Sequence, residues 1–181
     1  MTGQRYILLD RDGVINQDSD LFIKSPEEWQ PIEGSLEAIA LLTDHGFKVI
    51  VVSNQSGLAR GLFDQATLNK IHAKMLHLTE QAGGKIEAVY FCPHGPDDHC
   101  HCRKPKPGML KAFAGEYQAD LQKIHFIGDS FVDILAARAA DAKPMLVKTG
   151  KGRKTLLEHP ELNIPIFDNL YDAAQFITSE K

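Results

Sequence analysis

Four short apolar runs, each ending in polar residues, constrain the fold of this 181-residue chain more than any other feature. They are Tyr6–Leu9, Val49–Val52, Ala88–Phe91 and Ile124–Gly128. Fully apolar runs of this length are typical of strands buried on both faces of a parallel sheet. Stretches with helical periodicity separate the runs, so the sequence predicts an α/β fold in which helices cover the sheet.

The other elements follow from helical spacing, caps and glycine stops. Asp64 is a typical N-cap, and the helix that it begins should end at Gly83-Gly84; His72 and His77 on it are interpreted as packing or surface residues. Further helices are expected at 35–45, 107–117, 130–141 and 170–177, and further strands at 144–147 and near residue 166. The length fits a single domain, residues 1–181.

The first apolar run ends in Asp10-Arg11-Asp12-Gly13. Two carboxylates two residues apart on an extended chain point to the same side. Because open α/β sheets bind ligands at the carboxyl ends of their strands, this pair could hold a hard cation or attack an electrophile. The alternative is a simple Asp/Gly turn. The runs that end in Ser53-Asn54-Gln55 and Gly128-Asp129 predict that further polar groups converge on the same edge.

Bulk composition narrows the classes of function. The net charge of −4 offers no large basic field, which argues against general nucleic-acid binding. The polar start at residues 1–5 lacks the apolar stretch of a secretory signal, and no run approaches ~18 apolar residues. The expectation is a cytoplasmic protein without a membrane segment.

All three cysteines lie between Cys92 and Cys102. An odd cysteine count in a cytoplasmic protein argues against a disulfide framework. Cys92, His94, Cys100 and Cys102 supply enough ligands for a closed tetrahedral site, which predicts a structural Zn²⁺. His99 and His101 are alternative ligands, and unligated thiols are the alternative to a metal site.

Four segments resemble, in order, the four motifs of the haloacid dehalogenase superfamily: Asp10–Val14, Ser53–Gln55, Lys104, and Gly128-Asp129 with Asp133. The resemblance spans about residues 5 to 147. It implies the three-layer Rossmann-like parallel sheet of that superfamily, with a flap at residues 14–31 and no large cap. The alternative for 14–31 is a surface loop anchored by Trp29.

A narrower resemblance rests on three segments: Asn54–Gly61, Cys92–His94 and Cys100–Pro105. They are similar to the D-glycero-D-manno-heptose 1,7-bisphosphate 7-phosphatases, which act in lipopolysaccharide heptose synthesis, and the family pattern favours His94 as the zinc ligand. The histidinol-phosphate phosphatases carry a similar loop and are the alternative. Those heptose enzymes often have lysine where this chain has Ser130.

The resemblance implies a Mg²⁺-dependent phosphatase in which Asp10 attacks phosphorus and forms an aspartyl-phosphate. Asp12 protonates the leaving alkoxide and then activates water as a base. Mg²⁺ is expected on Asp10, Asp129 and the backbone carbonyl of Asp12, with Asp133 in an outer position. Ser53 and Lys104 are expected to bind the phosphoryl group.

The expected partner is a small phosphorylated sugar, bound by a monomer. Arg103 is the first candidate for its second phosphate or its hydroxyls, because guanidinium suits such oxygens, and Lys106 is a weaker one. The basic residues at 148, 151, 153 and 154 are further candidates for the second phosphate, but a solvated charged face is the expectation there. The full set of predicted substrate contacts is Asp18, Ser19, Asp20, Leu21, Ser53, Asn54, Gln55, Ser56, Arg60, Arg103 and Lys104.

Overall fold

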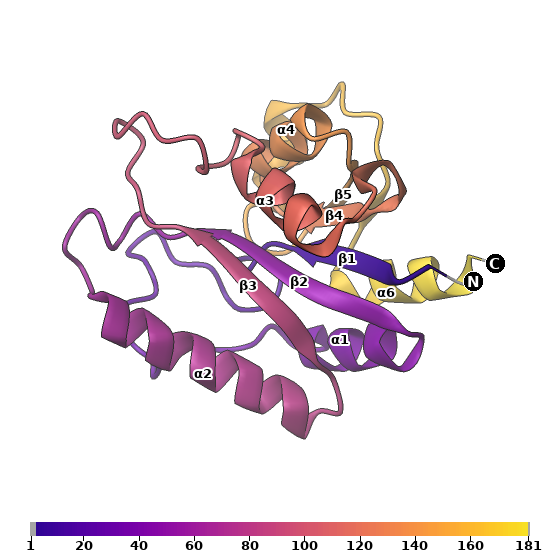
Figure 1. Ribbon diagram of the computed structural model, residues 1–181, viewed down its shortest axis with the longest axis horizontal. Coiled ribbons are helices and arrows are strands. Elements are labelled where there is room, and N and C mark those ends of the chain that lie inside the picture. Colours follow the sequence, from indigo (N-terminus) through magenta and orange to yellow (C-terminus); the bar gives the residue numbers. More distant parts are fainter. Residues whose placement is uncertain (1–2, 181) are drawn as a thin grey trace.

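The computed structural model describes residues 3–180 and contains a six-stranded parallel sheet in the order β3-β2-β1-β4-β5-β6 (Figure 1). The strands are β1 (Arg5–Leu9), β2 (Phe47–Asn54), β3 (Ile86–Cys92), β4 (His125–Gly128), β5 (Lys143–Val147) and β6 (Ile166–Phe167). The first apolar run lies at the centre, because β1 pairs with both β2 and β4. β2 extends past its apolar run, since Ser53 and Asn54 continue the pairing with β3.

Helices cover both faces of the sheet, as expected for a three-layer Rossmann-like fold. They are α1 (Ser35–Asp44), α2 (Gln65–Gln81), α3 (Gly108–Tyr117), α4 (Phe131–Ala139), α5 (Gly152–Glu158) and α6 (Leu170–Ser179), with a 3-10 turn η1 (Leu121–Lys123). In Figure 1, α1, α2 and α6 lie below the sheet, and α3 and α4 lie above it. Alternate residues of β1 face the two layers: Ile7 and Leu9 pack toward α1, and Leu8 packs toward α3.

The helix starts follow the cap chemistry of the sequence. The Asp64 carboxylate accepts the backbone N–H of Thr67 at 2.8 Å, as an N-cap should. Ser130 and Asp133 form a reciprocal capping box at the start of α4. Since α4 follows β4 directly, this cap fixes the helix at the carboxyl edge of the sheet.

Helix α5 was not expected, because its seven residues show no clear helical period and resemble a solvated charged segment. Tertiary contacts hold it instead. The Thr155 hydroxyl donates to the backbone carbonyl of Asp129 at 3.0 Å, and a Cβ at Gly152 would lie 1.8 Å from the carbonyl oxygen of Val147. The helix therefore packs beside the end of β4.

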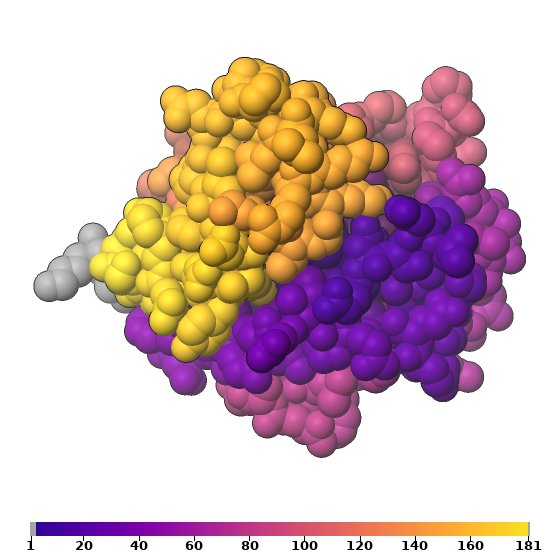
Figure 2. All heavy atoms as spheres, turned by 180° about the vertical axis from the view of Figure 1, so that it is seen from behind, coloured from indigo at the N-terminus to yellow at the C-terminus, as the bar shows by residue number. Residues whose placement is uncertain are grey.

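The flap between β1 and α1 is anchored at its base. Ile15 and Trp29 are fully buried, and Lys74 of α2 donates to the backbone carbonyls of Pro26 and Trp29 at 2.7 Å each. Trp29 is therefore the anchor of this segment, and Asp18, Ser19 and Asp20 of the same segment line the cleft described below, as expected of a flap. Figure 2 shows the indigo atoms of the flap lying beside the orange atoms of the segment that follows β5.

No large cap interrupts the described residues, in agreement with the expected architecture. Among residues 3–180, the structure contains no helix with the length and apolar character needed to cross a membrane.

Candidate active site

The carboxyl ends of β1, β2 and β4 open into a cleft of about 480 Å³, so the predicted convergence of polar groups is observed. The cleft is also bordered by the flap and by the segment between β3 and α3. The residues proposed from the sequence that line it are Asp10, Asp12, Asp18, Ser19, Asp20, Asn54, Gln55, Ser56, Arg60, Arg103, Lys104 and Asp129.

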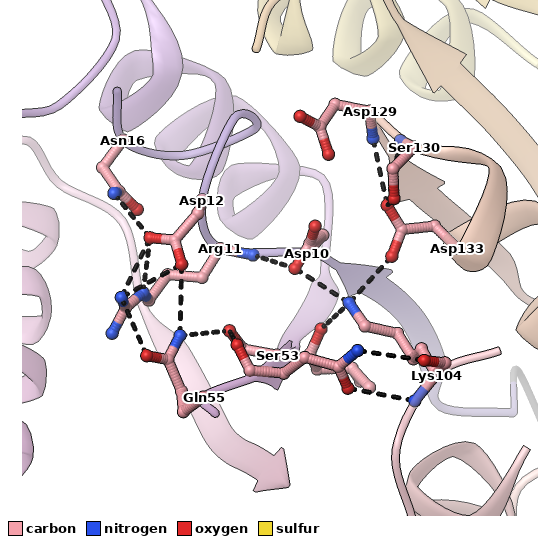
Figure 3. A network of polar contacts seen from close by, with 12 residues as sticks. Asp10, Arg11, Asp12, Asn16, Ser53, Gln55, Lys104, Asp129, Ser130 and Asp133 are labelled. Carbon is pink, nitrogen blue, oxygen red and sulfur yellow. Dashed lines mark hydrogen bonds and ion pairs between the residues drawn. The ribbon is translucent and has the colours of Figure 1, made fainter. Parts of the chain in front are cut away.

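Lys104 lies at the floor of the cleft between two carboxylates (Figure 3). Its Nζ is 2.9 Å from Oδ1 of Asp10 and 2.8 Å from Oδ1 of Asp133. The ammonium also donates to the carbonyl of Val52 at 2.9 Å. Burial alone would lower the pKa of Lys104, but the two carboxylates raise it well above its ordinary value, so the side chain is a fixed cation.

The backbone around Lys104 is held by Asn54 of β2. The Asn54 side chain accepts the N–H of Lys104 and donates to its carbonyl oxygen, both at 3.0 Å. This two-bond clamp places a residue from a distant part of the sequence beside Asp10. Asn54 therefore positions the lysine as well as lining the cleft.

The acidic residues of the floor repel one another. Asp10, Asp129 and Asp133 each place a carboxylate oxygen within 4.8 Å of the other two. Burial, together with Asp133, raises the pKa of Asp10 despite the neighbouring Lys104. Burial and Asp133 also raise the pKa of Asp129 to about 7. The three buried carboxylates outnumber the single ammonium, and their oxygens form a donor set that fits a hard divalent cation.

Two glycines pack against Asp129. A Cβ at Gly13 (φ +85°) would lie 2.0 Å from Oδ2 of Asp129, and a Cβ at Gly150 (φ +54°) would lie 2.2 Å from the same oxygen. The backbone N–H of Lys151 donates to this oxygen at 2.8 Å. Only glycine leaves the carboxylate its place, so the loops after β1 and β5 are shaped around Asp129.

Asp12 has a different environment, although it is only two residues from Asp10. The Arg11 guanidinium donates from Nε to Oδ1 at 3.0 Å and from Nη2 to Oδ2 at 3.1 Å. Asn16 donates to Oδ1 at 2.8 Å and Gln55 to Oδ2 at 3.2 Å. Burial would raise the pKa of Asp12, but Arg11 and the two amides hold it below its ordinary value.

The cysteine and histidine side chains form a compact group in the segment after β3. Cys92, His94, Cys100 and Cys102 can each place one ligand atom within 4.8 Å of all the others. The sulfur of Cys92 lies 3.0 Å from that of Cys102 and 3.7 Å from that of Cys100, too far for a disulfide of about 2.05 Å. The chemistry and spacing suit tetrahedral Zn²⁺. His99 and His101 lie outside this group.

The cysteine and histidine group is tied to the cleft through Arg103. The Arg103 backbone N–H donates to Sγ of Cys100 at 3.4 Å, and its guanidinium donates to the carbonyl of His94 at 3.4 Å. Burial opposes ionisation of Cys100, but the Arg103 N–H and the neighbouring Cys92 lower its pKa to about 6, which suits a thiolate ligand. The loop thereby fixes the residue that precedes Lys104.

Several predicted positions differ from their expected places. Leu21 is 76% exposed and does not line the cleft; Phe22 and Ile23 face it instead. Ser53 is buried below the floor, where its hydroxyl accepts from Gln55 at 2.7 Å. Lys106 donates to the carbonyl of Cys100 at 2.6 Å and is not part of the cleft lining.

The expected solvated face after β5 is also wrong in part, because Lys151 and Lys154 line the cleft. Lys151 lies 3.5 Å from Oδ2 of Asp18, and so joins the flap to the β5–α5 loop. Sequence reasoning named these lysines as candidates but favoured solvent, because the Gly-Lys-Gly-Arg-Lys stretch gives no sign that α5 packs against β4. It missed Phe131 and Val132 of α4, which complete that wall.

Similarity to known proteins extends over nearly the whole chain. Residues 101–173 match the family model described as HAD-hydrolase-like. The D-glycero-beta-D-manno-heptose-1,7-bisphosphate 7-phosphatase of Bordetella bronchiseptica is 56% identical over 154 residues, which cover 85% of this chain and 86% of that protein. The protein of the same name from Neisseria meningitidis is 49% identical over 180 residues, covering 97% and 96% of the two chains.

A solved structure is similar over almost the whole length. The crystal structure of D,D-heptose 1,7-bisphosphate phosphatase from B. bronchiseptica, complexed with magnesium and phosphate, has a TM-score of 0.95 and 50% sequence identity. The match covers 98% of this chain and 99% of that chain.

Proposed function

The chain belongs to the D-glycero-beta-D-manno-heptose-1,7-bisphosphate 7-phosphatase family of HAD-like hydrolases, and on this basis we propose that it hydrolyses the 7-phosphate of that β-heptose bisphosphate. It is a phosphoric monoester hydrolase. The observation that carries the proposal is the placement of Asp10 between the Lys104 ammonium and the Arg11-held Asp12. A carboxylate, a fixed cation and a second carboxylate are the groups that phosphoryl transfer through a covalent intermediate needs.

Asp10 is the proposed nucleophile. One of its carboxylate oxygens attacks the 7-phosphorus, the bond from phosphorus to the sugar oxygen breaks, and an aspartyl-phosphate forms. Lys104 opposes the rise in the pKa of Asp10 that burial causes, and its ammonium balances the charge of the carboxylate as the phosphate approaches. A carboxylate suits turnover because its acyl phosphate is readily hydrolysed, whereas a serine phosphate ester is not.

Asp12 is the proposed general acid and base. With its pKa held low, Asp12 is a carboxylate between turnovers. The incoming phosphate dianion raises that pKa, and the protonated group then gives its proton to the leaving sugar alkoxide. In the second half-reaction the carboxylate takes a proton from the water that attacks the aspartyl-phosphate.

Asp10, Asp129 and the backbone carbonyl of Asp12 are the proposed ligands of Mg²⁺. The buried acidic group fits this ion, and the similar B. bronchiseptica structure is complexed with magnesium. When bound, Mg²⁺ supplies positive charge that offsets the carboxylates and the phosphoryl oxygens. Asp133 accepts the N–H groups of Asp129 and Ser130, which makes it an orienting residue for the metal ligand.

The proposed Zn²⁺ on Cys92, His94, Cys100 and Cys102 is structural. Four protein ligands leave no open position for water. Its role would be to order a segment that has no apolar core of its own and to hold Arg103 at the cleft.

The second phosphate of the substrate needs cationic partners that do not take part in the reaction. Arg60, Arg103, Lys151 and Lys154 line the outer cleft and are the proposed set. Lys154 lies on α5 and lines the cleft together with Ser130, which stands at the start of α4. Heptose enzymes often carry lysine at the position of Ser130. The flap residues Asp18, Ser19 and Asp20 are proposed to contact sugar hydroxyls.

Histidinol phosphate is the alternative substrate, because the related phosphatases carry a similar cysteine and histidine loop. The cations of the outer cleft favour the bisphosphate, since histidinol phosphate carries a single phosphate and a cationic amine. The cytoplasmic location remains a prediction from composition, and the place in lipopolysaccharide synthesis remains a prediction from the resemblance.

The test is phosphate release in the presence of Mg²⁺ from the β and α heptose 1,7-bisphosphates and from histidinol phosphate, with Asp10→Asn as the control. We expect the β anomer to have the highest kcat/KM and the variant to be inactive. Preference for histidinol phosphate would contradict the proposed substrate. Full activity of Asp10→Asn would contradict the proposed nucleophile.

A further inference from the structure

Arg11 and His72 are buried side chains on the side of Asp12 that faces away from the cleft. Neither has a part in the proposed reaction. We propose that these two residues form a positioning pair that fixes the direction of the Asp12 carboxylate for proton transfer. The inference rests on the proposed function, because it concerns the residue that serves there as general acid and base.

Arg11 is an unusual residue for the end of a central strand. It is fully buried, and yet it carries a guanidinium whose charge must be balanced inside the protein. Two of its nitrogens reach the two oxygens of Asp12, and Nη2 also donates to Oε1 of Gln55 at 3.3 Å (Figure 3). This fork-to-fork geometry fixes the plane of the carboxylate as a single hydrogen bond could not.

His72 of α2 contacts the nitrogen of Arg11 that faces away from Asp12. Its Nε2 lies 3.1 Å from Nη1 of Arg11. A guanidinium has only donors, so Nε2 must be the acceptor and must carry no proton. His72 is 8% exposed, and burial, with Arg11, lowers its pKa to about 4, which keeps the imidazole neutral at physiological pH. The ring of Phe91 packs 6.0 Å away, centroid to centroid.

The contacts form a continuous path from a helix on one face of the sheet to the reacting groups. His72 fixes Arg11, Arg11 fixes both oxygens of Asp12, and Gln55 links Asp12 to Arg11 and Ser53. Without the acceptor on His72, one N–H of a buried guanidinium has no partner, and the guanidinium must turn toward another. That turn would rotate the carboxylate away from the leaving oxygen.

The test separates proton donation from folding and from binding. With enzyme in excess, leaving-group release is measured from the heptose bisphosphate and from p-nitrophenyl phosphate. A sugar alkoxide needs a proton as it leaves, whereas p-nitrophenolate does not. We expect His72→Leu to slow release of the sugar by about tenfold and release of p-nitrophenolate by less than about twofold. The enzyme concentration that gives half the maximal rate should be unchanged.

Two further variants complete the design. His72→Gln places an amide oxygen where Nε2 stood, so it should restore the sugar rate. Arg11→Lys keeps the charge but lacks the fork, so it should lower the sugar rate selectively. His77→Leu is the matched control, because His77 lies exposed on the same helix.

The results distinguish failure of the inference from failure of the proposed function. A wild-type enzyme that releases no heptose 1-phosphate from the bisphosphate would overturn the proposed function itself. If the wild type is active, equal slowing of both substrates in His72→Leu and in Arg11→Lys would overturn the positioning role. If His72→Leu does not fold, Arg11→Lys and the rescue by His72→Gln decide the question.

Discussion

At the scale of single residues, neighbouring carboxylates differ because their partners differ. Asp10 and Asp12 are two residues apart and both are largely buried. Asp10 faces two other carboxylates and one lysine, which leaves its pKa raised; Asp12 faces a guanidinium and two amides, which leave its pKa lowered. Such divergence between adjacent groups is how one site supplies a metal ligand and a proton carrier.

His72 should make the stability of the protein depend on pH. Its pKa falls from 6.5 in the unfolded chain to about 4 in the folded protein, so the unfolded state binds the proton more tightly. The stabilising contribution is therefore complete above pH 6.5 and is lost as pH falls toward 4. We expect up to about 3 kcal/mol of the unfolding free energy to disappear over this range.

The measurement is urea unfolding of the wild type and of His72→Gln at several pH values. The unfolding free energy of the wild type should fall relative to that of His72→Gln as the pH decreases, because glutamine does not titrate. His77→Gln should follow the wild type, since that side chain is exposed. A constant difference between wild type and His72→Gln from pH 4 to 7 would contradict the assignment.

At the scale of elements, the loops after the strands are shaped by the groups they must admit. The loops after β1 and β5 bring Gly13 and Gly150 against Asp129, and the loop after β3 carries the cysteine and histidine group. The first two loops accommodate a side chain from a distant part of the chain, whereas the third is organised by its own side chains.

Gly150→Ala should weaken Mg²⁺ binding by at least about tenfold, because the added Cβ would displace the Asp129 carboxylate. Gly61→Ala is the control: Gly61 also has a positive φ of 69°, but its Cβ would meet nothing within 4 Å. That variant should lose only about 1 kcal/mol of unfolding free energy and keep its Mg²⁺ affinity. Isothermal titration calorimetry with Mg²⁺ measures the affinities of the two variants. Equal Mg²⁺ affinities would contradict the proposed role of Gly150.

Removal of the proposed Zn²⁺ should abolish activity while Mg²⁺ is in excess, because Arg103 and Lys104 directly follow Cys102, a proposed zinc ligand. His94→Ala should bind less zinc and lose activity by at least about tenfold. His101→Ala is the matched control, since His101 is exposed and lies outside the ligand group. Metal analysis of the purified proteins gives the zinc content. An active, zinc-free His94→Ala would contradict the structural role.

At the scale of the whole molecule, the cleft collects residues from segments that are distant in the sequence. The flap, the end of β2, the segment between β3 and α3, and α5 each contribute one wall. The acidic floor and the cationic rim are therefore joined only in the folded chain. This separation of charge suits a substrate with one phosphate to be cleaved and another to be held.

Lys154→Gln should raise KM for the heptose 1,7-bisphosphate by about tenfold and leave KM for the heptose 7-phosphate nearly unchanged. The reason is that only the first substrate carries the second phosphate. Lys148→Gln is the control, because Lys148 pairs with Asp168 at 2.7 Å and does not line the cleft. Equal increases of KM for both substrates in Lys154→Gln would place the second phosphate elsewhere.

Local sequence was sufficient to define the central strands and the chemistry at their ends. Apolar runs of this length, separated by helical stretches, are typical of a parallel sheet, and the carboxyl ends of parallel strands meet at one edge, so the pattern predicts that Asp10 and Asp129 lie together. Lys104 joins them through the resemblance to the superfamily motifs. The three cysteines and the Asp64 cap were equally local, because spacing and residue type suffice to identify them, whereas the choice of His94 over His99 and His101 came from the resemblance.

Tertiary packing, by contrast, selected the side chains that face the cleft and the contacts that hold them there. Leu21 and Phe22 are neighbours on the flap, but Leu21 is exposed and Phe22 lines the cleft. Only the packed flap decides which of the two faces the cleft. Helix α5 has no periodic pattern and exists because Gly152 and Thr155 fit against β4 and β5. The contact of His72 with Arg11 joins residues 61 positions apart, and no local pattern encodes a hydrogen bond of that range.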